Sequence, residues 1–397
     1  MKKKLFAAGL VGAIIGIFLS ISFTVFFFNL DKKSAFNIGR MFGAMKFIEM
    51  NYVNEVDKSK LLEGAIEGMV HSLNDPHSLY MDTKLYSRLK AETSGSFGGI
   101  GVYMGFRNNG VQVLSVMPDS PGAKAGLAAG DSILAVDGEP VADIAPDEVA
   151  LKIRGDVGSD VNLLIKREGE ADKNYTITRD VINIKTVFGT MLDDGSAYVR
   201  ITNFSENTGK EFKEVLSEEN FANIKGMILD LRQNPGGTIT SCVEVAGEIV
   251  PAGDIVSVVE RDGKKEVFKS GLENPKYPIV VLMDKYSASA SELLAGALQD
   301  TGAAVIVGET SYGKGSVQTV VPMFADDALK LTIAKYYTPS GRSIDGTGIV
   351  PDFEVKLEKP VMIERELQTK NPPDAQLLKA EEILKNQIQA GKILFDK

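Results

Sequence analysis

The chain has 397 residues, of which 44% are hydrophobic and 24% are charged. This length is enough for two or three domains, and the composition is ordinary for a globular protein. The formal net charge of −9, with no long basic run after the N-terminus, argues against nucleic acid as the main partner. The single cysteine, Cys242, excludes an intramolecular disulfide and a zinc site built on paired cysteines.

The N-terminus is typical of a membrane anchor. Three lysines precede an uncharged run of 26 residues, Leu5 to Leu30, and roughly 20 apolar residues span a bilayer as a helix. No clear cleavage site follows, so residues 1–33 are predicted to be a cytoplasmic stub and a transmembrane signal anchor, with a cleaved signal peptide as the alternative. The triple lysine favours a cytoplasmic N-terminus, although Lys32 and Lys33 oppose it. Both interpretations place the globular part on the extracytoplasmic side of the cell membrane.

Residues 34–93 are predicted to be helical. Apolar residues recur at helical spacing in two stretches, which begin near Met41 and Leu61. The sequence Asn-Asp-Pro at 74–76 is expected to end the second helix. Core packing is the favoured role of these apolar stripes, and a contact within a dimer is the alternative.

Residues 94–170 are predicted to form a compact domain that opens with a glycine-rich loop, SGSFGGIG. Strands are expected at 100–103, 111–116, 132–136 and 161–165, and a helix at Pro146–Ile153. Glycines let a carboxylate approach the backbone closely, so such a loop can direct N–H groups at the C-terminus of a peptide that adds as an extra strand. The candidate peptide-binding residues are Phe97, Gly98, Gly99, Ile100, Gly101 and Val102.

Two further patterns follow this loop, SPGAKAGL at 120–127 and GDSILAVDG at 130–138. Together with the loop they resemble the PDZ domain of exported proteases. The resemblance implies that the partners are proteins or peptides bound through their C-termini.

Strands and helices alternate from about residue 181, which is typical of an α/β fold with a mainly parallel sheet. Residues 171–360 are therefore predicted to be an α/β domain, and residues 361–397 a C-terminal helical segment. The expected strands are 197–201, 226–230, 279–283, 304–307 and 316–322, and the expected helices are 206–216, 242–250 and one that begins near 289.

The sequence KYSASASE at 285–292 places three serines between a buried strand and a helix. A serine there lies beside the free N–H groups and the dipole of the helix N-terminus, which stabilise an oxyanion. The competing interpretation is that Ser289 and Glu292 form only a capping box. These considerations alone do not choose among Ser287, Ser289 and Ser291.

A serine nucleophile needs a base, and no histidine follows His77. Lys314 is the candidate, because burial disfavours an ammonium ion and lowers its pKa. It follows the expected strand 304–307, so it should lie near the sheet edge that carries Ser289. The alternatives are a solvated loop lysine and a phosphate-binding P-loop. The sequence GETSYGK fits the P-loop pattern, but Gly315 replaces its Ser or Thr and a strand is expected where a helix is required.

The sequence DLRQNPGG at 230–237 follows another buried strand. Its two glycines, Gly236 and Gly237, can offer backbone N–H groups to an oxyanion. An ordinary tight turn is the alternative interpretation.

These blocks, with LNDPHSLYM at 73–81 and YYTPSGRSIDGTGIVPDFEV at 336–355, resemble the carboxyl-terminal processing (tail-specific) protease family over residues 38–360. The resemblance implies a crotonase-like α/β serine protease core with Ser289 as nucleophile and Lys314 as base. It further implies that Gln318 orients the lysine. The implied oxyanion donors are Ala290 and one of Gly236 and Gly237, and Arg154 is implied to couple peptide binding to assembly of the site.

The expected protein is thus a membrane-anchored serine endopeptidase that cleaves exported proteins, forms a homodimer and needs no metal or other cofactor. A catalytically silent exported PDZ scaffold is one alternative, which the joint presence of Ser289, Lys314 and Gln318 disfavours. An acyl-CoA-type enzyme is another, and the signal anchor disfavours it because CoA is cytoplasmic.

Overall fold

The computed structural model describes residues 31–395 except 108–109, 143, 324–325 and 358–373. The chain divides into two compact units, residues 1–80 and 81–397. The run Leu5 to Leu30, in which the anchor is predicted, lies outside the described residues. None of the described helices has the length and apolar character that a membrane span requires.

The described part of the first unit, residues 31–80, contains the helices α2 (Lys32–Asn51) and α3 (Lys58–His71). An aspartate caps each N-terminus: Asp31 accepts from the Ser34 N–H at 2.7 Å and Asp57 from the Ser59 N–H at 2.9 Å. The predicted break at 74–76 is confirmed, because α3 ends at His71.

The second unit begins with α4 (Thr83–Ser94), which follows the short strand β1 (Leu79–Met81). Strand β2 (Ser96–Gly99) then pairs antiparallel with β9 (Asp180–Asn183). The expectation of a loop over 94–101 was therefore wrong for these four residues. Glycine is needed within this strand because a Cβ on Gly98 would lie 2.0 Å from the carbonyl oxygen of Gly155.

A second sheet of the unit has the strand order β3-β4-β5-β7-β8, with β6 paired to β5. Its core consists of Ile100 and apolar residues of the strands and of α6. The last strand, β8, continues the sheet to Thr178, beyond the expected boundary at 170. The bounds are β3 (Val102–Arg107), β4 (Gly110–Val116), α5 (Pro121–Ala125), β5 (Ser132–Val136), β6 (Glu139–Pro140), α6 (Pro146–Ile153), β7 (Asp160–Lys166) and β8 (Lys173–Thr178).

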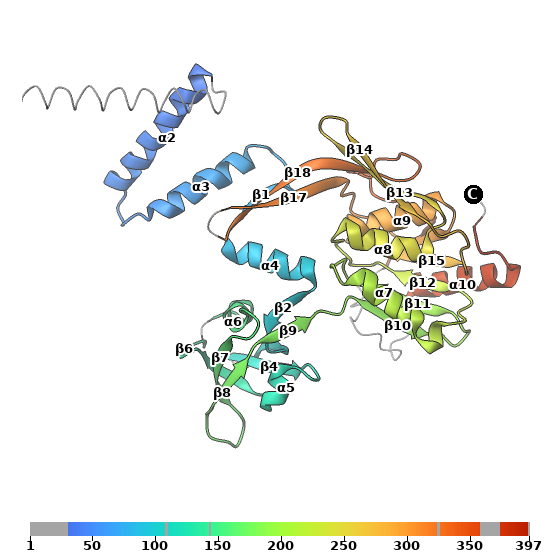
Figure 1. The fold of residues 1–397 in the computed structure, drawn as a ribbon, viewed down its shortest axis with the longest axis horizontal. Coiled ribbons are helices and arrows are strands. Elements are labelled where there is room, and N and C mark those ends of the chain that lie inside the picture. Colours follow the sequence, from blue (N-terminus) through green and yellow to red (C-terminus); the bar gives the residue numbers. More distant parts are fainter. Residues whose placement is uncertain (1–30, 108–109, 143, 324–325, 358–373, 396–397) are drawn as a thin grey trace, which may run out of the picture. The chain divides into compact units, whose positions relative to one another are not determined.

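The α/β core is built on a sheet of order β10-β11-β12-β15-β16-β19, in which only the β10–β11 pair is antiparallel among the described strands. Alternate residues of the buried strands face opposite ways. One face packs on α7, α8 and α9, and the other on α10 (Figure 1). The strands are β10 (Val187–Met191), β11 (Ala197–Ile201), β12 (Met227–Asp230), β15 (Ile279–Met283), β16 (Ala304–Gly308) and β19 (Phe353–Glu354). The helices are α7 (Thr208–Ser217), α8 (Ile239–Ile249), α9 (Ala290–Asp300) and α10 (Ala375–Ala390), and a short 3-10 turn spans Glu219–Phe221.

A further, antiparallel sheet of the core joins β14 (Lys265–Ser270), β13 (Gly253–Glu260), β18 (Ala328–Tyr337) and β17 (Ser316–Pro322) in that order. Of these strands the sequence predicted only β17. The sheet matters for the site because β17 begins two residues after Lys314, and β18 carries Tyr336.

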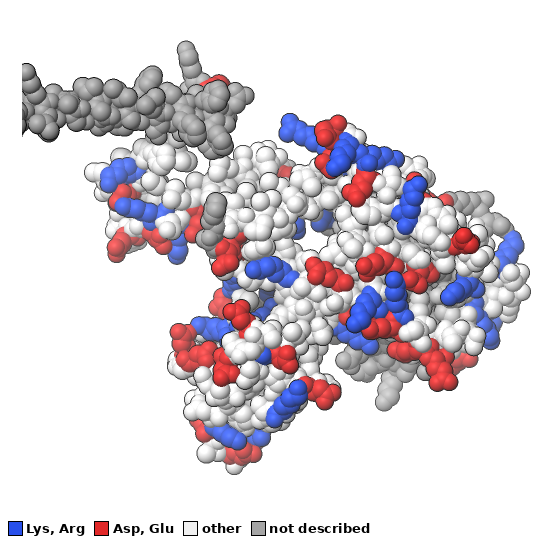
Figure 2. Space-filling view, viewed as in Figure 1, with Lys and Arg blue, Asp and Glu red and all other residues white. Residues whose placement is uncertain are grey.

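On the face shown in Figure 2, basic and acidic side chains are interspersed over the described surface.

Candidate active site

Ser289 lies between the end of β15 and the start of α9, at the carboxyl edge of the parallel sheet. Its backbone has φ 54° and ψ −117°. A side chain rarely adopts such a conformation, which costs about 1–3 kcal/mol and persists where the surroundings impose it. The residue is only 5% exposed. The turn thus holds one serine in a strained conformation at the helix N-terminus.

The neighbouring serines have structural roles. The Ser287 hydroxyl donates to the carbonyl oxygen of Leu231 at 2.9 Å. The Ser291 hydroxyl donates to the carbonyl oxygen of Asn234 at 3.0 Å. Both serines are completely buried, whereas Ser289 retains some exposure. Of the three serines that the sequence left open, Ser289 is the one whose hydroxyl is not committed to a backbone carbonyl.

The hydroxyl of Ser289 instead has a tyrosine neighbour. Tyr336, on β18, is buried, and its hydroxyl lies near the side chain of Ser289. Burial raises the pKa of Tyr336 to about 12, although the nearby Ser289 side chain acts in the opposite direction. The Tyr336 hydroxyl is therefore neutral at physiological pH and can act as donor or acceptor towards the serine.

Glu292 connects the segment that carries Ser289 with the segment that carries Lys314. Its Oε2 accepts from the backbone N–H groups of Ser289 at 2.7 Å and Lys314 at 2.9 Å. Its Oε1 accepts from the Gly313 N–H at 2.7 Å and the Ser311 hydroxyl at 2.6 Å. The predicted capping box is therefore present, and the same carboxylate also reaches the segment of Lys314. Glu292 is completely buried, so these four donors are what satisfies the carboxylate within the described residues.

Lys314 lies between β16 and β17 and is half-buried. Its backbone hydrogen bond to Glu292 places it at the sheet edge that carries Ser289, as the sequence predicted. The residues after it form β17. A P-loop needs a helix at this point, so the structure excludes that alternative.

Gln318 lies on β17, four residues beyond Lys314. Its amide nitrogen donates to the hydroxyls of Ser316 at 2.8 Å and Thr332 at 3.2 Å. These contacts fix the amide plane of Gln318 between β17 and β18. That Gln318 orients Lys314 stays a prediction.

The turn at 234–237 packs directly against Ser289. A Cβ on Gly236 would lie 2.6 Å from the carbonyl oxygen of Ala288 and 2.8 Å from the nitrogen of Ala290, and its φ is +95°. The Gly236 N–H donates to the side-chain oxygen of Asn234 at 2.9 Å. No acceptor pairs with the Gly237 N–H in the part of the chain that the structure describes. Gly237 is thus the glycine with a backbone donor left for a ligand.

Asn234 organises this turn, and the sequence analysis did not single it out. Its side-chain nitrogen donates to the Ile201 carbonyl oxygen at 2.9 Å, and its backbone oxygen accepts from the Ala288 N–H at 3.0 Å. An asparagine before Pro-Gly-Gly is a common turn former, which is the signal that was available.

The candidate peptide-binding residues lie beside an open sheet edge. Among the described strands, β3 pairs on one side only, with β4, and α6 packs near it. The predicted loop residues are divided between β2, the connection at Ile100 and Gly101, and the start of β3. The Arg154 guanidinium stacks 4.1 Å from the centre of the Phe97 ring. The Gly155 N–H donates to the Gly98 carbonyl at 3.1 Å, so the end of α6 is tied to the glycine segment.

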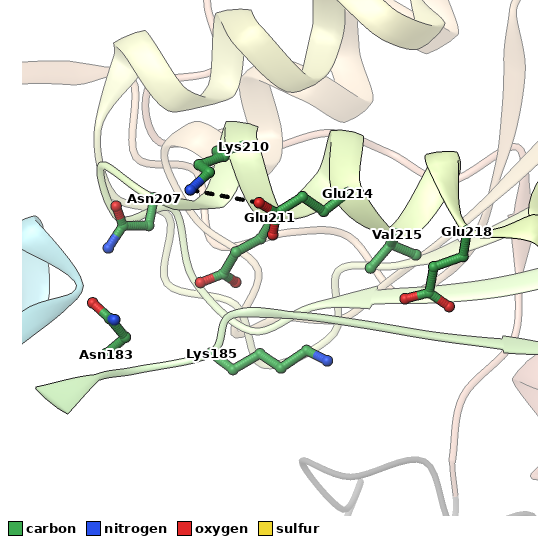
Figure 3. A pocket seen from close by; sticks show the side chains of 8 residues that line it. All are labelled: Asn183, Lys185, Asn207, Lys210, Glu211, Glu214, Val215 and Glu218. Atoms are coloured by element: carbon green, nitrogen blue, oxygen red, sulfur yellow. Dashed lines mark ion pairs between the residues drawn. The ribbon is translucent and has the colours of Figure 1, made fainter. Parts of the chain in front are cut away.

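A pocket of about 370 Å³ lies elsewhere, between α7 and the chain that enters β10 (Figure 3). It contains none of the predicted site residues. Its lining consists of Asn183, Lys185, Asn207, Lys210, Glu211, Glu214, Val215 and Glu218. Glu211 binds the backbone N–H groups of Thr186 and Val187, so it has a structural role in joining α7 to β10.

Three family models match the chain. Residues 195–355 match the model of peptidase family S41, residues 112–167 that of a PDZ domain, and residues 29–85 that of the activating protease CtpB N-terminal domain. A carboxy-terminal-processing protease of Bartonella bacilliformis is 39% identical over 87% of this chain and 82% of its own length. The carboxy-terminal processing protease CtpB of Bacillus subtilis is 40% identical over 79% of this chain and 66% of its own.

A solved structure of a photosystem II D1 C-terminal processing protease aligns with a TM-score of 0.46 at 27% identity, covering 80% of this chain and 92% of its own. The identity of 39% to the Bartonella relative over most of both chains, together with the family models, settles the classification. The chain belongs to the carboxy-terminal processing proteases of peptidase family S41, and it is a serine-type peptidase with a PDZ domain.

Proposed function

We propose that the chain is a membrane-anchored endopeptidase in which Ser289 attacks the scissile carbonyl and Lys314 is its general base. The observation that carries this proposal is the shared carboxylate of Glu292, which binds the backbones of both residues. It draws together two segments that are 25 residues apart in the sequence. The Ser287 and Ser291 hydroxyls already donate to backbone carbonyl oxygens, which supports the choice of Ser289.

In the proposed reaction, neutral Lys314 accepts the proton of the Ser289 hydroxyl as the oxygen attacks the carbonyl carbon. The backbone N–H groups of Ala290 and Gly237 hold the oxyanion, and losing one such donor typically costs about 2.7–4 kcal/mol of transition-state stabilisation. Lys314 then protonates the leaving amine. Water hydrolyses the acyl-enzyme with the lysine again as base, and Gln318 keeps the lysine oriented.

The PDZ domain is proposed to select substrates by their C-termini. An unstructured tail would add to the open edge of β3, with its carboxylate at the N–H groups between Gly98 and Val102. Arg154 would couple peptide binding to the rest of the chain, because its guanidinium stacks on Phe97 in the glycine-rich segment where the peptide is proposed to bind.

Cleavage of unfolded casein by the purified chain 34–397 tests the catalytic proposal. Ser289→Ala and Lys314→Ala are expected to abolish cleavage while circular dichroism stays unchanged. Lys264→Ala, which removes an exposed lysine from the β13–β14 hairpin, is the matched control. Normal turnover by Lys314→Ala would refute the dyad. Absence of cleavage by the parent, even with a range of C-terminal peptides added, would favour the silent scaffold.

The location and the oligomeric state are part of the same proposal. The apolar run Leu5 to Leu30 supports an anchor with the catalytic part outside the cytoplasm. Resistance of the full chain to alkaline extraction from membranes, with sensitivity to external protease in intact cells, is expected. Exposed apolar side chains on α2, such as Phe36 and Phe47, support a homodimer. Sedimentation of 34–397 as a monomer at all concentrations would contradict it.

A further inference from the structure

A buried ion pair, Asp230 with Arg232, lies just before the turn at 234–237, which carries the proposed oxyanion donor Gly237. Asp230 ends β12 and is completely buried, and Arg232 is 2% exposed. The Arg232 guanidinium donates to Asp230 through Nε at 3.0 Å and Nη2 at 2.6 Å. Burial raises the pKa of Asp230, but the charge and hydrogen bonds of Arg232 outweigh this, so the pKa lies below its usual value. Both groups are therefore charged, and breaking such a pair leaves an uncompensated buried charge.

The remaining nitrogen of this guanidinium binds the start of α10. Arg232 Nη1 donates to Asp374 Oδ2 at 2.8 Å and to Gln376 Oε1 at 3.1 Å. Asp374 also caps α10, because its other oxygen accepts from the N–H groups of Gln376 and Leu377. Both acceptors lie outside the stretch 195–355 that matches the peptidase model.

The residues on either side of Arg232 form hydrogen bonds with the segment that leads to Ser289. The Gln233 N–H donates to Asp284 Oδ1 at 3.0 Å. The Leu231 carbonyl accepts from the Ser287 hydroxyl. The turn is therefore held on one side by the segment that carries Ser289. On the other side, the side chain of Arg232 anchors it to α10.

We propose that Asp374, assisted by Gln376, is a positioning residue of the peptidase site, through which α10 fixes Arg232 and hence the oxyanion turn at 234–237. This inference rests on the proposed function of that turn. The C-terminal helix is then a part of the catalytic apparatus and not only a cover for the sheet. Its apolar residues Ala380 and Leu384 pack on β12 and β15 and supply the docking force. The Asp374 carboxylate, which caps α10, aligns Arg232 and with it the turn at 234–237.

The test is Asp374→Asn in the chain 34–397, assayed on casein and on a short peptide. Asparagine keeps the size and the capping oxygen but withdraws the charge that faces Arg232. A displacement of the turn weakens oxyanion binding, which acts in the transition state only. We therefore expect kcat to fall on the order of 10–100-fold with KM changed less than about 2-fold. Asp374→Glu is expected to restore most of the rate.

Glu382→Gln is the matched control, because Glu382 lies on the same helix in an exposed pair with Lys379. It is expected to leave kcat unchanged. Gln376→Ala removes the neutral acceptor of Arg232, together with the hydrogen bond that the Gln376 amide donates to the Val355 carbonyl oxygen at 2.8 Å. Its smaller loss of kcat keeps the inference testable if Asp374→Asn does not fold. Unchanged kcat in folded Asp374→Asn and Gln376→Ala would overturn the inference. A loss of kcat that Glu382→Gln reproduces would also overturn it.

Amide hydrogen exchange separates this inference from the catalytic proposal, because it needs no activity. A peptide covering 231–238 is expected to exchange faster in Asp374→Asn than in the parent, with no change in Glu382→Gln. Unaltered exchange there would refute the positioning role even if the enzyme were active. Faster exchange in a chain that cleaves nothing would support the positioning role and count against the proposed chemistry.

Discussion

Replacing Glu292 by glutamine is expected to disable the peptidase with little change in the shape of its core. The two carboxylate oxygens each accept two hydrogen bonds, and three of the four donors are backbone N–H groups. A glutamine amide has one oxygen and one NH2 group. If the NH2 group stands in place of Oε2, it faces two backbone donors, and two hydrogen bonds are lost in a completely buried place. If it stands in place of Oε1, it can donate to the Ser311 hydroxyl oxygen, and the Gly313 N–H is left without its acceptor.

The magnitude follows from that count. A buried donor left without a partner costs about 1–3 kcal/mol, so the two orientations of the amide cost about 1–3 and about 2–6 kcal/mol. If the backbone moves to relieve this cost, Ser289 and Lys314 move relative to each other. A displacement on the order of 1 Å reduces the rate about 100-fold, which corresponds to about 2.7 kcal/mol of activation free energy.

The assay is kcat/KM on casein and a peptide substrate, beside thermal unfolding of the same protein. Glu260→Gln, in an exposed pair with Lys264, is the control for loss of a surface carboxylate. We expect a decrease of at least about 100-fold in kcat/KM for Glu292→Gln. A folded Glu292→Gln variant with kcat/KM within about 3-fold of the parent would refute the argument that this carboxylate aligns the two residues.

Three other variants or conditions follow from the geometry. Gly236→Ala should lower kcat/KM at least about 100-fold, because its Cβ would lie 2.6 Å from the Ala288 carbonyl oxygen. The control Gly247→Ala, with open space at its Cβ, should not lower kcat/KM, and equal kcat/KM values for the two variants would contradict the packing argument. Arg154→Ala should reduce stimulation of cleavage by C-terminal peptides, measured as the ratio of stimulated to basal rate, and an unchanged ratio would argue against coupling through Phe97. Ion pairing and hydrogen bonds, opposed by burial, depress the pKa values of Asp131, Asp230 and Asp300 below the unfolded value. The contribution of these three carboxylates to stability is complete above about pH 5 and is lost as the pH falls through their folded-state pKa values. The Tm should therefore decline below about pH 4, and a Tm that stays constant down to about pH 2 would refute their role in stability.

The strands with continuous apolar runs were predictable from the sequence. The strands Ala197–Ile201 and Ile279–Met283 and the helix Pro146–Ile153 have the bounds that the pattern gave. Local signals suffice there, because a fully buried strand needs apolar residues throughout and Pro marks the first turn of a helix. The glycine segment at 96–99 was misjudged because its strand partner, β9, lies more than 80 residues away in the sequence and gives no local signal.

The antiparallel sheet of β13, β14 and β18 escaped prediction for a related reason. Its strands carry lysines and glutamates at exposed positions, such as Lys265 and Glu266 on β14, so their apolar pattern is interrupted. The site shows the same division between local and distant information. The local pattern offered three serines, among which the family resemblance implied Ser289. The partners of Ser287 and Ser291, which lie far along the chain, support that choice.

Glu292 illustrates how a local motif can be read correctly and still miss the function. The S-x-x-E spacing predicts a glutamate that bonds the backbone of the N-cap residue, and this bond is present. In a serine peptidase with a histidine base, an acid near the site would be assigned to orient the base side chain. Here the carboxylate binds backbone N–H groups of both segments instead. A lysine has a long, flexible side chain, so fixing its backbone close to the nucleophile is the first requirement for using it as a base, and a buried carboxylate shared by the two backbones meets it.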